Sequence, residues 1–108
     1  MKRLFVLLSV LAIAVFVFVA AGVAKEAEKK GGALFKQNCS PCHPDGGNII
    51  NPQKTLHKKD REANGVKKAA DIVNKMRNPG PGMTKFDEKT LPDKDAKEIA
   101  EYILKTFK

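Results

Sequence analysis

Hydrophobic residues divide the chain into two parts of different character. Residues 4–19 are almost continuously apolar, follow two basic residues, and lead into a run of small residues that ends at Ala24. A basic start, an apolar stretch and a small-residue end are the three parts of a secretory signal. We therefore expect residues 1–24 to be a cleaved signal peptide and residues 25–108 to form one small domain. The alternative is an uncleaved anchor, because the apolar stretch approaches the ~20 residues that span a bilayer.

After residue 24, apolar residues recur at helical spacing in short runs that turn-forming residues separate. The predicted helices are residues 31–38 after a polar lead-in, residues 55–64 before Gly65, the stretch from Ala69 to Met76 before Asn78–Pro79, and a last helix with apolar positions from Ala96 to Phe107. Thr90 and Asp93 have the spacing of a capping box, and Pro92 suits a first helical turn. The pattern predicts four short helices and no strand pair, joined by loops long enough to need a central organising group.

The sequence Cys39-Ser40-Pro41-Cys42-His43 has the C-x-x-C-H pattern of covalent haem attachment. Two thiols three residues apart can add to the two vinyl groups of one porphyrin, and His43 then lies beside the iron as an axial ligand. We expect the other ring nitrogen of His43 to donate to a backbone carbonyl, with Pro52 as the candidate acceptor. The motif predicts one haem c.

Three other uses of the two cysteines compete with haem. A thioredoxin-like pair needs a βαβ context, which the pattern does not provide. Structural zinc takes four ligands, and His57 is the one conventional residue left to complete Cys39, Cys42 and His43. A disulfide across so short a loop would stabilise little. Because the chain carries an export signal, haem is the preferred interpretation over all three.

The methionines differ in their surroundings. Met76 is in phase with the apolar residues of its predicted helix, which is typical of a core residue. Met83 follows Gly80-Pro81-Gly82 in a loop and has no packing periodicity, so we expect it to be the second iron ligand. With both axial positions filled by protein, the expected role is electron transfer and not catalysis. A five-coordinate haem protein that binds ligands or acts as a peroxidase is the competing class.

The charge balance bears on partners. The chain has 20 basic and 12 acidic residues and a formal charge of +8. Nucleic acid is a common partner for such a balance, but export argues against it. We expect redox partners with acidic docking surfaces, approached through lysines. The lysines considered are Lys36, Lys54, Lys58 and Lys85.

Taken in order along the chain, these features resemble the class I cytochromes c, in particular the cytochrome c6 (c553) type, over nearly all of residues 25–108. The shared positions are Gly32 and Phe35 before the motif, the loop Gly47–Leu56 after it, Met83 with Phe86, and Tyr102 in the last helix. One departure is clear: the family usually has Met-Pro-Ala-Phe where this chain has Met83-Thr84-Lys85-Phe86.

The resemblance implies an all-α cytochrome c fold around one covalent haem, with Cys39 and Cys42 as attachment points and His43 and Met83 as iron ligands. It implies a monomeric one-electron carrier in the periplasm or, in a phototroph, the thylakoid lumen. It does not imply photosynthesis, because carriers of this type also serve respiratory chains. Contact with a membrane is expected only if the N-terminal segment stays uncleaved.

Overall fold

The computed structural model describes residue 22 and residues 25–108. The predicted signal peptide lies outside these residues apart from Gly22, so its cleavage stays a prediction. The described part of the chain is helical and contains no strand, which confirms the predicted all-α class. The elements are a first helix (residues 25–38), the 3₁₀ turn η1 (Pro44–Gly46), α2 (Lys58–Ala63), α3 (Ala69–Arg77) and α4 (Asp93–Thr106). Within these residues, no helix has both the length and the apolar character to span a bilayer.

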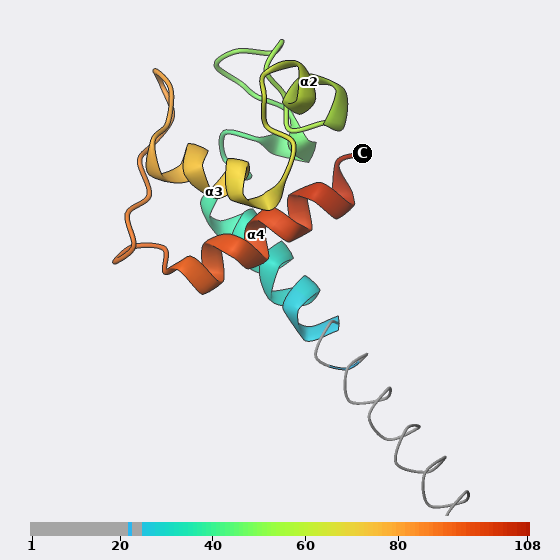
Figure 1. Ribbon diagram of the computed structural model, residues 1–108, viewed down its shortest axis with the longest axis vertical. Coiled ribbons are helices and arrows are strands. Elements are labelled where there is room, and N and C mark those ends of the chain that lie inside the picture. Colours follow the sequence, from blue (N-terminus) through green and yellow to red (C-terminus); the bar gives the residue numbers. More distant parts are fainter. Residues whose placement is uncertain (1–21, 23–24) are drawn as a thin grey trace, which may run out of the picture.

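The core lies where α3 and the first helix pack against α4 (Figure 1). One face of α4 is completely buried, because its small and branched apolar residues recur at helical spacing. The buried apolar residues are Phe35, Ile72, Met76, Leu91, Ala96, Ile99, Ala100, Ile103 and Phe107. Met76 is therefore a core residue, as its periodicity predicts. The first helix also begins earlier than predicted, since residues 25–30 are already helical.

Two glycines let the first helix approach α4 closely. A Cβ atom on Gly31 would overlap the carbonyl oxygen of Glu98, and one on Gly32 would lie 3.1 Å from the ring of Tyr102. One turn later, the rings of Phe35 and Tyr102 pack with their centroids 5.4 Å apart. This aromatic pair joins the first helix to α4 at two of the positions shared with the family, and it anchors the end of the helix from which the cysteines follow.

The helix ends show where local sequence signals hold and where they fail. Gly65 ends α2 as predicted, with φ +76°. Its N–H donates to the Glu62 carbonyl and the Val66 N–H donates to the Arg61 carbonyl, which together form a Schellman motif.

The capping box predicted at the start of α4 is wrong. Pro92 is the N-cap, and the Thr90 N–H donates instead to the Asp87 carboxylate at 2.8 Å. The N–H of the buried Leu91 also donates to the Asp87 carbonyl at 2.9 Å, so the chain forms a turn before the helix begins.

Candidate functional site

The cysteine segment (residues 39–57) begins directly at the end of the first helix. The Cys39 N–H donates to the Phe35 carbonyl at 2.8 Å, and the His43 N–H donates to the Cys39 carbonyl at 2.8 Å. These bonds hold both cysteines and His43 in a tight turn that continues directly from a helix anchored in the core. Both thiols are free. The structure therefore places the motif on one short, hydrogen-bonded turn.

The two thiols have different surroundings. Cys39 is half-buried against the core, whereas Cys42 is exposed. Burial, and secondarily the nearby Cys42 sulfur, raise the pKa of the Cys39 thiol to about 11. Cys39 is thus a neutral thiol at neutral pH, because an apolar environment disfavours its charged form.

The His43 ring is fixed by its own segment. Its Nδ1 lies 2.7 Å from the Gly47 carbonyl oxygen, so the acceptor predicted at Pro52 is wrong although a backbone carbonyl does fill the role. The reason is a tight reversal, in which Asp45 at φ 52° and Gly46 at φ 78° turn the chain back within four residues of the histidine. With Nδ1 bonded to a carbonyl, Nε2 is the ring nitrogen left to bind a metal.

Asn48 organises the rest of the cysteine segment. Its side-chain oxygen accepts from the N–H groups of Ile50 and Asn51, and its side-chain nitrogen donates to the Lys54 carbonyl. The Leu56 N–H closes the loop on the Gly46 carbonyl at 2.7 Å. Asn48 therefore holds the backbone of this loop, while the side chains of Ile49 and Ile50 stay exposed.

The methionine loop (residues 78–91) leads from α3 to α4 without helix (Figure 1). It approaches the cysteine segment at Gly82, where a Cβ atom would lie 3.2 Å from two side-chain carbons of Ile50. Met83 is 36% exposed, in contrast to the buried Met76. The difference between the two methionines therefore agrees with their sequence surroundings.

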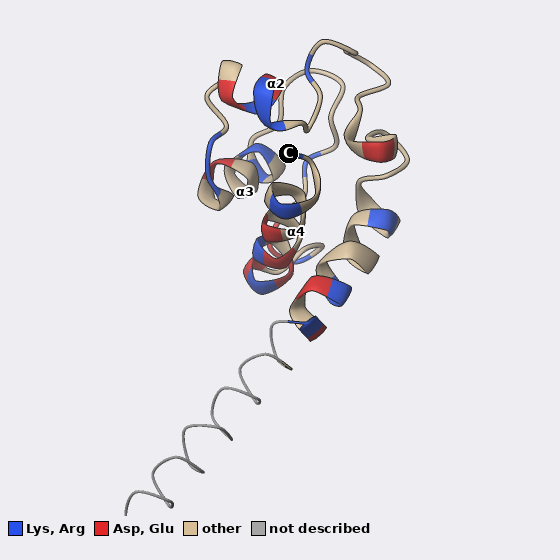
Figure 2. Cartoon of the chain, turned by 90° about the vertical axis from the view of Figure 1, so that its right-hand side faces the viewer, with Lys and Arg blue, Asp and Glu red and all other residues tan. Residues whose placement is uncertain are grey.

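Exposed apolar side chains gather on these two loops. The large hydrophobic residues exposed in the described structure are Ile49 and Ile50 of the cysteine segment and Met83 of the methionine loop. Such side chains suit an apolar group that would lie between the loops and cover them. Together with two free thiols and an oriented imidazole, they fit a covalent porphyrin. Charged residues of both signs, by contrast, are intermixed along α4 (Figure 2).

Two arginines form clamps that the sequence pattern did not reveal. Arg61, 5% exposed, donates to the carbonyls of Leu56 and Phe107 and ties the cysteine segment to the end of α4. Arg77 donates to the carbonyls of Phe86 and Leu91 in the methionine loop. A basic residue in the last turn of a helix is the available sequence signal, but it does not identify the carbonyls bound.

The alternative ligand His57 packs beside an aromatic residue of the core. Its exposed ring lies edge-on to that of Phe107, with the centroids 5.6 Å apart. In the same residues, no group of three or more His, Cys, Asp or Glu side chains could hold a metal ion. The structure therefore forms no zinc cluster around the motif in its described part.

Comparisons with known proteins identify relatives over most of the chain. The family model described as "Cytochrome C oxidase, cbb3-type, subunit III" matches residues 26–103. Cytochrome c6 of Nostoc is 35% identical over 105 residues, covering 96% of this chain and 93% of the relative. Cytochrome c6 of Cyanidium caldarium is 38% identical over 74 residues, covering 68% of this chain and 66% of the relative. Cytochrome c6 of Synechocystis is 42% identical over 74 residues, covering 68% of this chain and 61% of the relative. The chain thus spans slightly less than two thirds of these last two proteins.

Solved structures agree in fold. Outer membrane cytochrome OmcF from Geobacter sulfurreducens is 47% identical with a TM-score of 0.71, and the match covers 72% of this chain and 99% of that chain. Cytochrome c6C from Synechococcus is 26% identical with a TM-score of 0.67, over 72% of this chain and 94% of that chain.

Proposed function

Because the chain belongs to the cytochrome c6 group of the class I cytochromes c, we propose that it is a one-electron carrier between larger redox proteins. Members of this family carry covalent haem c with iron and transfer electrons without acting as enzymes. When bound, the haem iron alternates between ferrous and ferric states and so carries one electron. The geometry above supports the roles that we propose for individual residues in this chain.

Cys39 and Cys42 hold the porphyrin through thioether bonds, and His43 Nε2 binds the iron. The observation that carries this assignment is the bond between His43 Nδ1 and the Gly47 carbonyl at 2.7 Å. It fixes the ring tautomer, leaves Nε2 as the nitrogen for the iron, and makes that nitrogen a stronger donor. The backbone bonds from the Cys42 and His43 N–H groups to the Cys39 carbonyl keep both cysteines within one turn of this histidine.

Met83 is the second iron ligand in this proposal. Of the two methionines in the described structure it is the exposed one, and its loop meets the cysteine segment at Gly82 and Ile50. A thioether favours ferrous iron and raises the reduction potential. Two fixed protein ligands also leave no open coordination position, which favours electron transfer over ligand binding.

The ligation is tested with Met83→Ala in holoprotein, and Met76→Leu is the matched control at the buried methionine. Met83→Ala should remove the iron–sulfur charge-transfer band of the oxidised protein, lower the potential and open the iron to carbon monoxide. Met76→Leu should keep the band. Strong carbon monoxide binding by the unaltered protein would instead support the five-coordinate class. An unchanged band in Met83→Ala would reject Met83 as the sulfur ligand.

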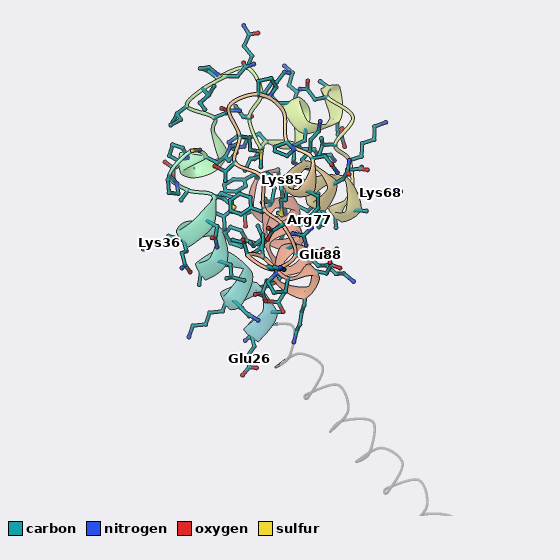
Figure 3. The ribbon with its side chains drawn as sticks, turned by 90° about the vertical axis from the view of Figure 1, so that its left-hand side faces the viewer. Glu26, Lys36, Lys68, Arg77, Lys85 and Glu88 are labelled. Carbon is teal, nitrogen blue, oxygen red and sulfur yellow. The ribbon has the colours of Figure 1, made fainter. Side chains whose placement is uncertain are left out.

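Docking on acidic partners through lysines is the second part of the proposal. Lys36 lies on the first helix and Lys85 on the methionine loop, and both are exposed (Figure 3). Lys85 is two residues from Met83, so a partner bound there would be near the iron. The rate of electron exchange with an acidic partner should fall as salt rises. Lys85→Glu should slow it more than Lys97→Glu on α4, and equal or absent effects would reject this surface.

Export completes the proposal. Removal of residues 1–24 would deliver the haem domain to the periplasm or a thylakoid lumen as a monomer, where the attachment chemistry can take place. The mass of protein purified from an exporting host tests this directly. It should equal residues 25–108 plus one haem, whereas a mass that retains the apolar segment would indicate an anchor.

A further inference from the structure

Arg77, the last residue of α3, bonds to the chain that follows Met83 at Phe86 and again near the start of α4. Its Nη1 donates to the carbonyl oxygens of Phe86 at 3.0 Å and Leu91 at 2.8 Å, and its Nη2 pairs with the Asp93 carboxylate at 2.7 Å. The arginine side chain is 17% exposed. In Figure 3, Arg77 lies between the loop residues Lys85 and Glu88. One guanidinium therefore holds two points of the methionine loop and one point at the start of α4.

The part of the loop around Met83 has little support of its own. Within residues 79–85, the described structure has one internal hydrogen bond, from the Met83 N–H to the Gly80 carbonyl at 3.3 Å. The next fixed point is the Phe86 N–H, which donates to the Met76 carbonyl at 2.9 Å. Thr84 also stands where the family usually has a stiffening proline. The position of Met83 therefore depends on how firmly Phe86 is held.

The chemistry of Arg77 suits this task. Guanidinium is planar, always charged, and can donate several hydrogen bonds in a fixed fork. Hydrogen bonds from a charged donor are about twice as strong as those between neutral groups. The fork is itself anchored, because its helix is buried through Ile72 and Met76.

We propose that Arg77 is the positioning residue for Met83, which it holds in place for the iron by fixing the Phe86 and Leu91 carbonyls. The inference rests on the proposed function, in which Met83 ligates iron. Arg77 does not touch the iron. It acts on the equilibrium between a bound thioether and one released when the loop moves outward.

The test measures how readily imidazole displaces Met83 from the iron of the oxidised holoprotein. The loss of the iron–sulfur charge-transfer band reports this displacement. Arg77→Gln removes the charged fork, so the apparent affinity for imidazole should rise about 10-fold to 100-fold, which corresponds to the loss of a charge-assisted hydrogen bond. Asp93→Asn removes the ion pair but keeps both carbonyl bonds, and should change the affinity by much less.

Arg61→Gln is the matched control for general loss of stability. It makes the same substitution in the other carbonyl clamp, whose acceptors are Leu56 and Phe107. Both variants should lower resistance to denaturant, but only Arg77→Gln should promote displacement of Met83. Equal displacement in the two variants, or none in Arg77→Gln, would overturn the proposal.

Two further outcomes are informative. If Arg77→Gln does not yield holoprotein, Arg77→Lys keeps the charge without the fork and should shift imidazole affinity in the same direction, by less; no shift would reject the inference. If the unaltered protein lacks the charge-transfer band, the Met83 ligation itself fails. A band lost in Met83→Ala with unaltered displacement in Arg77→Gln rejects Arg77 alone.

Discussion

The cysteine segment and the methionine loop achieve order in different ways. The cysteine segment bonds to itself: His43 to Gly47, Asn48 to three backbone groups, and Leu56 back to Gly46. The methionine loop has few such bonds and is held from outside by Arg77. The conformation of a segment that bonds to itself depends mainly on its own residues. A segment clamped from outside can be released by one substitution.

The largest effect is expected where the cysteine segment meets the aromatic core. Gly46 has φ 78°, and a Cβ atom there would lie 2.5 Å from the Phe107 ring. Gly46→Ala combines backbone strain with overpacking, so the free energy of unfolding should fall by about 3 kcal/mol or more. Denaturant unfolding measures this. Gly65→Ala is the control, since its φ is 76° but nothing lies within 4 Å, and it should cost about 1 kcal/mol.

A smaller loss of stability is expected when the cysteine segment loses internal hydrogen bonds and so becomes more like the methionine loop. Asn48→Ala removes the side-chain partners of the Ile50 and Asn51 N–H groups and of the Lys54 carbonyl. Stability should fall by about 1–2 kcal/mol, because these bonds are partly solvated. Hydrogen exchange at Ile50 and Asn51 should accelerate, while that at Phe86 stays unchanged. Acceleration in both loops would show that they order together.

The reverse change should make the methionine loop less dependent on its clamp. Thr84→Pro restores the family's proline, and Thr84 does not lie in the positive-φ region. Its N–H donates no backbone hydrogen bond in the described structure. Stability should rise by about 0.5–1 kcal/mol through a stiffer unfolded chain. Imidazole should displace Met83 less readily, and a stability loss instead would indicate an incompatible backbone at this position.

The smallest expected effect is a change in folding stability at acidic pH. The Thr90 N–H donates to Asp87 and lowers the pKa of this carboxyl below its ordinary value of 3.8. A group with a depressed folded pKa stabilises the protein above its unfolded pKa, and this contribution is lost as pH falls through the folded value. The stability difference between the unaltered protein and Asp87→Asn should therefore shrink below about pH 3.8. A constant difference would exclude Asp87 as the titrating group.

Much of the fold follows from local sequence, because helical periodicity and glycine stops act over a few residues. Met76 and Met83 could be told apart in this way, and Gly65 ends α2 as predicted. The acceptor for His43 could not be predicted, because it depends on Asp45 adopting a left-handed conformation that few sequences require. Arg77 binds carbonyls 9 and 14 residues away, and such contacts leave no periodic signal.

Phe107 has a consequence for the order of events during biosynthesis. Its carbonyl accepts from Lys58 and Arg61, and its ring packs on Phe35 and against Gly46. The support beside the cysteine turn is thus incomplete until residue 107 has left the ribosome and, for an exported chain, crossed the translocation channel. A nascent polypeptide therefore carries both cysteines before it carries the aromatic residue that packs beside their turn.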